Sequence, residues 1–101
     1  MRMLLNVRIP NEPFNSLVRD GTAGDVVGRI IEDCRPESIY FTEQDGARGA
    51  VVVVEVASAA DIPRLAEPWF LMFDAECELR IAMTPEDLQK AGLDKLGSRW
   101  Q

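Results

Sequence analysis

The chain has 101 residues, 47% of them hydrophobic, and its 11 basic and 17 acidic residues give a net charge of −6. This length predicts a single domain spanning residues 1–101, and the hydrophobic content is typical of a globular fold. The acidic balance argues against nucleic acid and against an anionic membrane surface as partners. Histidine is absent, which excludes Ser-His-Asp and Cys-His nucleophile systems, histidine-ligated haem and most zinc sites.

No segment approaches the roughly 20 apolar residues that span a bilayer. The apolar N-terminus resembles the start of a signal peptide, but Asn6 and Arg8 interrupt it and no small-residue cleavage site follows. We therefore expect a soluble, cytoplasmic protein. Cys34 and Cys77 each lie in an apolar pattern, which favours two buried, reduced thiols over a disulfide.

Three strands are predicted in the first part of the chain. Residues 2–9 alternate with a period of two and stop at Pro10, which cannot donate to a ladder. Residues 38–43 and 49–57 flank an Asp45-Gly46 pair, which is a strong hairpin signal. We expect these two strands to pair antiparallel.

Helical spacing fills the interval between the first two strands. Residues 11–20 and 22–34 place apolar side chains on one helical face, with Asn11 and Thr22 as the expected N-caps. Asp20-Gly21 interrupts the pattern. The sequence therefore leaves open two short helices or one broken helix.

A further helix is expected over residues 58–67. Asp61 is its preferred cap, since Pro63 then falls in the first turn. Pro68 is expected to kink or end this helix, which leaves residues 69–73 without a firm assignment.

The remaining residues predict a strand and a short helix. Residues 74–83 form the fourth strand, and Thr84 caps a helix that runs to about Ala91. Residues 97–101 are expected to form a mobile tail, unless Trp100 docks it.

The order β-α-β-β-α-β with an extra C-terminal helix is that of a ferredoxin-like α+β fold, in which two helices cover one face of a four-stranded antiparallel sheet. One sheet face is purely apolar and should pack on the helices. The other is mixed, and Leu4, Val51 and Val53 lie in its middle. A second copy of the same face would cover them, so we expect a homodimer.

The element order, the stretch from Val51 to Val56, the segment Leu65-Ala66-Glu67-Pro68-Trp69-Phe70 and the closing strand resemble the dimeric α+β barrel superfamily. More narrowly, the chain is similar to small bacterial proteins of unknown function, and the resemblance covers nearly all of the chain. It implies a homodimer with a cavity between sheet and helices. It implies no particular reaction, because the superfamily includes cofactor-free monooxygenases, lactone isomerases, haem enzymes and members without known activity. The haem branch normally offers a histidine ligand, so we expect no cofactor, and no residue cluster predicts a metal.

Two groups of residues are candidates for ligand binding. The first comprises Asn6, Arg8, Glu55 and Arg80, which should share one face of three adjacent strands. Glu55 interrupts a valine run, where a carboxylate is costly unless it is paired. Two arginines beside it would bind a carboxylate or enolate, or alternatively form a salt-bridge network that fixes the dimer register, which we favour.

Tyr40 and Trp69 form the second group, because aromatic residues with a polar atom often line ligand cavities. An ordinary place in the core is the favoured alternative. We expect a dimer that binds a small organic molecule between sheet and helices. Two alternatives stay open: a cofactor-free monooxygenase or isomerase acting on a small aromatic or lactone substrate, and a structural or partner-binding dimer without a ligand.

Overall fold

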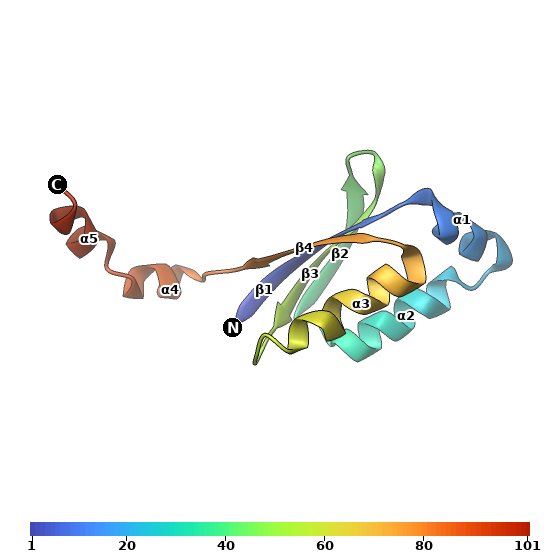
Figure 1. Ribbon diagram of the computed structural model, residues 1–101, viewed down its shortest axis with the longest axis horizontal. Helices are drawn as coiled ribbons and strands as arrows, with labels where there is room; N and C mark the ends of the chain where they lie inside the picture. Colours follow the sequence, from blue (N-terminus) through green and yellow to red (C-terminus); the bar gives the residue numbers. More distant parts are fainter.

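Figure 1 shows the computed structural model, which describes all 101 residues. The strands are β1 (Arg2–Ile9), β2 (Ser38–Gln44), β3 (Ala47–Glu55) and β4 (Glu76–Ile81). The helices are α1 (Asn11–Asp20), α2 (Ala23–Cys34), α3 (Asp61–Phe73), α4 (Pro85–Lys90) and α5 (Leu93–Arg99). The chain is thus an α+β protein, as the sequence predicts.

The four strands form one antiparallel sheet in the order β2-β3-β1-β4, which fits a ferredoxin-like arrangement. The first strand lies between the third and the fourth, as predicted. Helices α2 and α3 lie side by side on one face of the sheet (Figure 1), and nothing in the chain covers the other face. We call that uncovered side the open face. It carries Leu4, Asn6, Arg8, Tyr40, Val51, Val53, Glu55, Glu78 and Arg80.

The hydrophobic core fills the space between the sheet and the helices. Alternate residues of β1 and β3 point into it, which follows from the period of two in a strand. Trp69 and Phe73 of α3 are its largest fully buried side chains. The whole cluster comprises Met3, Leu5, Val7, Ile9, Ile30, Ala50, Val52, Val54, Val56, Leu65, Trp69, Phe73 and Ala75.

The first helical segment is two helices, which resolves the alternative that the sequence left open. Gly21 ends α1 with a φ of 83°, and its N–H donates to the carbonyl oxygens of Leu17 and Val18. Asn11 does not cap α1: Pro10 precedes the helix without a side-chain cap hydrogen bond, and the non-helical backbone of Glu12 interrupts the first turn. Thr22 does occupy the N-cap of α2, but its hydroxyl bonds to the side chain of Asp20 and does not cap the helix.

The structure extends α3 beyond its expected bounds. Of the two outcomes expected at Pro68, an end of the helix is excluded, since α3 continues to Phe73 and its last turns carry the two large aromatic side chains of the core. Asp61 is not the cap, since Ala60 is, and the Asp61 carboxylate accepts hydrogen bonds from the N–H groups of Ala57 and Ser58 in the preceding turn.

The Asp45-Gly46 hairpin is confirmed. Both residues have positive φ, 51° and 80°, which is the backbone that a two-residue turn between twisted strands requires. The fourth strand is shorter than expected and begins at Glu76, because Asp74 takes a left-handed conformation as the C-cap of α3.

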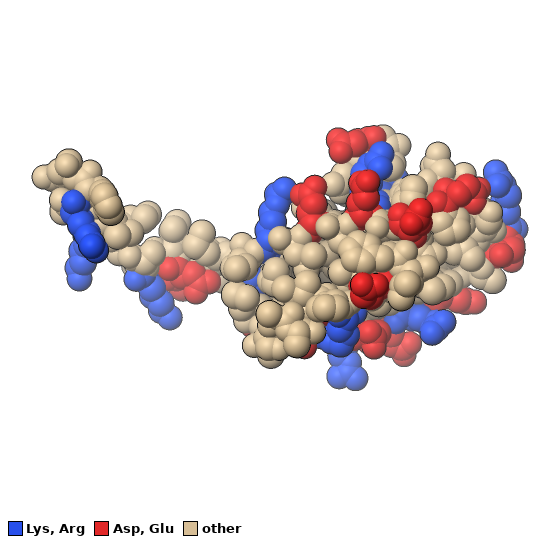
Figure 2. Space-filling model, viewed as in Figure 1, with Lys and Arg blue, Asp and Glu red and all other residues tan.

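Residues 83–101, here the C-terminal arm, project beyond the sheet (Figure 1) and hold two helices where the sequence predicts one. Residues 97–99 of the expected tail belong to α5, and Trp100, which follows the helix, is 78% exposed. Figure 2 shows both signs of charge along the arm, with uncharged stretches between them. No helix of the molecule is both long and apolar enough to cross a membrane.

Candidate functional site

Five of the six residues singled out from the sequence lie on the open face. Val51 of β3 has Tyr40 of β2 on one side and Asn6 of β1 on the other, and Arg8 lies opposite Gly49. The two others on this face are Glu55 and Arg80. These residues therefore share one face, as the sequence predicts. Whether they form a site depends on the distances between their side chains along the strands.

The structure does not bring the two arginines beside Glu55. Arg8 and Glu55 are separated by three steps of two residues along the strands, which is roughly 20 Å at 3.4 Å per residue. Arg80 is level with Val53 and so lies only two residues from Glu55 along the strand direction. However, Arg80 is on β4 and Glu55 is on β3, and β1 lies between these two strands. These groups therefore do not converge on one ligand within a single chain.

Each of these charges instead has a local partner. Arg8 pairs with Glu76 at 3.7 Å, and Arg80 pairs with Glu78 at 2.9 Å. The carboxylate of Glu55, 61% exposed, is bound by the N-terminal ammonium group of Met1. Exposed pairs of this kind contribute little to stability.

Trp69 and Tyr40 lie on opposite sides of the sheet. Trp69 is fully buried beside Phe73, with ring centroids 6.0 Å apart, and its indole N–H has no hydrogen-bond partner. Tyr40 is 67% exposed on the open face. Trp69 is thus an ordinary core residue, which is the alternative that the sequence favours. The two aromatic rings share no cavity.

A pocket does exist between the sheet and the helices, at the hairpin end of the sheet, with a volume of about 310 Å³. We call it the Arg48 pocket. Phe14 of α1 and Val27 of α2 form one wall, and the strand ends form the other. Its full lining is Ile9, Phe14, Val27, Phe41, Thr42, Arg48 and Gly49.

The packing of α1 and of the central strands forms the pocket. The break between α1 and α2 turns Phe14 back onto the core, where its ring lies 4.9 Å from that of Phe73. Gly49 admits close packing of the strands, because a Cβ there would lie 3.2 Å from the Val7 carbonyl oxygen. The hairpin that joins β2 and β3 projects away from α2 and α3 (Figure 1), and the pocket lies beside it.

Arg48 is the one charged residue in this pocket. Its guanidinium lies 4.6 Å from the centre of the Phe14 ring and donates a hydrogen bond of 2.8 Å to the Asn15 side-chain oxygen. No carboxylate lies within ion-pair distance of it. A guanidinium has five N–H donors, so the others remain available to a ligand. This arrangement suits a molecule with an apolar body and an anionic group.

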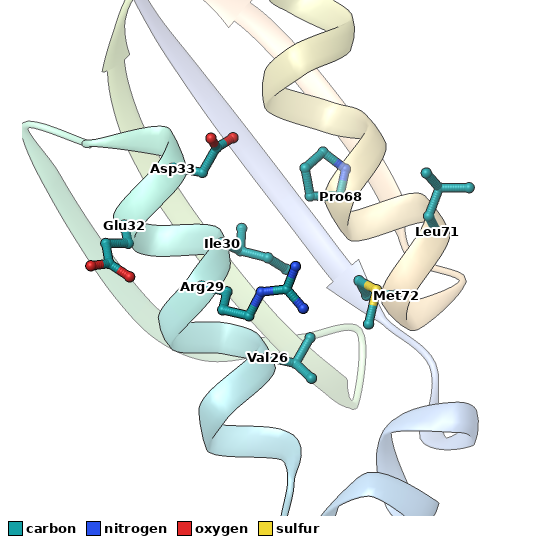
Figure 3. Close-up of a pocket in the computed structure, with 8 residues that line it drawn as sticks. All are labelled: Val26, Arg29, Ile30, Glu32, Asp33, Pro68, Leu71 and Met72. Carbon is teal, nitrogen blue, oxygen red and sulfur yellow. The ribbon is translucent and has the colours of Figure 1, made fainter.

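A second and wider groove lies between α2 and α3 on the outer surface, with a volume of about 500 Å³. In Figure 3, Arg29 reaches from α2 towards Met72 of α3, whereas Glu32 points away. Leu71 on the α3 side is 78% exposed. The groove is apolar at its walls and charged on the α2 side, and none of its polar side chains is buried.

The two thiols are half-buried and free. Burial raises the pKa of Cys77 to about 11 and also raises the pKa of Cys34. Both thiols therefore stay protonated at neutral pH, and neither is an activated nucleophile. No group of three histidine, cysteine, aspartate or glutamate side chains is placed to hold a metal ion.

Sequence reasoning missed Arg48 and Phe14. A signal was present for the arginine, since Arg48 is two residues before Ala50 and so belongs to the same strand face as the buried Val52 and Val54. The arginine at the end of this row of buried residues therefore predicts a charged side chain on the helix side of the sheet. Phe14 carries no such signal, because its position depends on the turn between α1 and α2.

Comparison with known proteins adds no relative: no family model matches the chain, and no curated protein matches it.

Proposed function

We propose that this chain is a homodimeric α+β barrel protein that binds a small organic molecule, with an apolar body and an anionic group, in the Arg48 pocket. The observation that carries the proposal is the Arg48 guanidinium, which faces an apolar pocket and has no carboxylate partner. The pocket volume of about 310 Å³ lies at the small end of the range for ligand sites, which suits a ligand of metabolite size.

Dimerisation is supported by the open face. Leu4, Val51 and Val53 sit only partly covered in the centre of the sheet, and Tyr40 is exposed beside them. An apolar patch in mid-sheet is stabilised when a second copy covers it, and the two-fold dimer is the commonest such arrangement. Packing two open faces would form the barrel that the superfamily resemblance implies.

We propose binding and not catalysis, because of what the pocket walls can do. Arg48 supplies the only polar side chain that faces the pocket. Thr42 is in register with Gly49 and Arg8, so its hydroxyl lies on the open face with the Tyr40 side chain. A permanently protonated guanidinium orients and holds a ligand, but it does not accept a proton at neutral pH. An oxygenase or isomerase at this place would need a base that the wall does not supply.

The test titrates the protein with phenylacetate and with neutral phenylacetamide, following amide shifts by NMR. Phenylacetate should shift the amides of Thr42 and Gly49 and bind at least tenfold tighter than the amide. Arg48→Gln should remove that preference, whereas Arg29→Gln, which removes an arginine from the other groove, should keep it. Equal affinity for the two probes, or an unchanged Arg48→Gln variant, would contradict the site.

A further inference from the structure

The C-terminal arm exposes large apolar side chains that nothing in the chain covers. No hydrogen bond or ion pair joins residues 83–101 to the rest of the molecule. Neither of its helices has a buried residue. The exposed apolar residues of the arm are Met83, Leu88, Leu93, Leu96 and Trp100.

The arm's helices are too short to persist alone. α4 has 6 residues and α5 has 7, and isolated helices shorter than about 12–15 residues are marginal in water. Strong end signals are nonetheless present, because Thr84 and Asp87 form a capping box and Gly92 takes a left-handed conformation between the helices. Helices with such signals and with apolar side chains require a surface to pack on, and it must belong to another molecule.

The open face of the sheet is the matching unpartnered surface. Its strands, six to nine residues long, give an outline of roughly 19 Å by 20–30 Å, or about 400–600 Å², whereas a stable interface buries about 800 Å² on each partner. Only its centre is apolar, since ion pairs such as Arg8–Glu76 and Arg80–Glu78 flank it. The sheet face alone is therefore at the small end for a stable dimer, and the arm would supply the missing apolar area.

Charge and connectivity also favour a second copy as the occupant. The arm holds three basic and three acidic residues, so the chain's net charge of −6 resides entirely on residues 1–82. A neutral arm approaches another such body without the repulsion that two bodies exert on each other. The arm continues from β4, a strand of the open face (Figure 1), so arm and face form one continuous surface.

We infer that the C-terminal arm of each chain packs on the open face of a second copy, so that two arms and two faces form one two-fold interface. This inference rests on the proposed dimer and adds the segment that holds it together. A two-fold axis makes the exchange reciprocal, because each chain offers the same arm and the same face.

The test measures the dimer dissociation constant by sedimentation equilibrium. Leu96→Asp combined with Trp100→Asp should weaken the dimer at least 100-fold. Gln89→Asp combined with Ser98→Asp adds the same two charges to the arm at polar positions and should change the constant less than threefold. Far-UV circular dichroism verifies that the sheet is intact in both variants.

Two further variants locate the docking surface. Val53→Asp on the open face should weaken the dimer as strongly as the arm variant does, and Leu71→Asp in the α2–α3 groove should not. Dissociation by Leu71→Asp alone would mean that the arm docks in the groove, which overturns the inference. A dimer that survives the arm variant but not Val53→Asp would overturn the arm's role and leave the proposed dimer standing. A monomeric native protein would overturn both.

Discussion

Helices α3 and α4 form for opposite reasons. Helix α3 has poor local signals, because Pro68 lies inside it and its N-cap residue makes no side-chain hydrogen bond, yet four of its residues are buried: Leu65, Ala66, Trp69 and Phe73. Helix α4 has a capping box and a proline in its first turn, yet it has no buried residue. Within one chain, packing stabilises α3, whereas α4 has only its local hydrogen bonds.

This difference separates the body of the molecule, residues 1–82, from its arm. In the body, removal of buried volume should reduce the free energy of unfolding, because helices and sheet share one core. In the arm, the same kind of change should leave that free energy alone and alter only local helicity. Pairs of matched substitutions can test the separation.

The largest effect is expected from Trp69→Ala. The side chain is fully buried in the core, and truncation of a buried tryptophan costs about 3–5 kcal/mol. Urea unfolding followed by circular dichroism should show this loss, whereas Trp100→Ala in the arm should change the free energy of unfolding by less than about 0.5 kcal/mol. The measurement is made at a dilution at which the chain is monomeric. Equal losses from the two substitutions would show that arm and body are one cooperative unit.

The sequence predicts the sheet well because its signals are local. The period of two in β1 and the Asp45-Gly46 turn each specify their own structure, and together they fix which side chains face the helices. The sequence left the end of α3 open, because a proline in a helix costs about 3 kcal/mol. Burying two large side chains such as Trp69 and Phe73 yields about 1.5–3 kcal/mol each. Packing therefore wins, and packing is not visible in a local pattern.

The candidate site was less predictable than the fold. The sequence correctly places Asn6, Arg8 and Glu55 on one face, but their partners were not predictable. The N-terminal ammonium group, which binds Glu55, depends on where the first strand starts relative to the third. The Arg48 pocket depends on the angle between α1 and the sheet, which only the assembled core determines.

Gly49→Ala should be the next largest change. A Cβ at this position would lie 3.1 Å from the Cβ of Gln44 and 3.2 Å from the Val7 carbonyl oxygen, which belongs to the backbone of the central strand and cannot move freely. Overpacking of this kind costs about 1–3 kcal/mol. Differential scanning calorimetry should show a lower Tm, and an unchanged Tm would mean that the β1–β3 pairing is more compliant than its geometry indicates.

Gly28→Ala and Gly97→Ala make the same change in a body helix and in an arm helix. A Cβ at either position meets no atom within 4 Å, so only helix propensity changes, by about 0.5–1 kcal/mol. Gly28→Ala should raise the free energy of unfolding by that amount. Gly97→Ala should raise only the helical circular dichroism signal of the folded monomer. A rise in global stability from Gly97→Ala would show that the arm unfolds together with the body.

The smallest effect is a pH dependence confined to the arm. The N–H of Thr84 donates to the Asp87 carboxylate at 3.0 Å, and this bond, with the Thr84 side chain, lowers the pKa of Asp87 from its ordinary value of 3.8. A lowered pKa in the folded state means that the cap stabilises α4 fully above pH 3.8 and is lost as the pH falls through the folded-state pKa. Carbon chemical shifts of residues 85–90 should therefore lose helical character below about pH 4, while those of β1 remain constant.

Asp87→Asn is the matched variant for this titration, because it keeps an oxygen acceptor at the cap and removes the titrating group. The experiment is best made in the Leu96→Asp/Trp100→Asp background, in which contact with a second copy is weakened and the cap acts alone. The pH dependence of α4 should disappear in the Asp87→Asn variant. If α4 melts at the same pH with asparagine at this position, the acid transition belongs to another group and the capping box does not maintain the helix. If α4 stays helical to pH 2 in both, the arm is stabilised by packing as the body is, and the separation between the two regions does not hold.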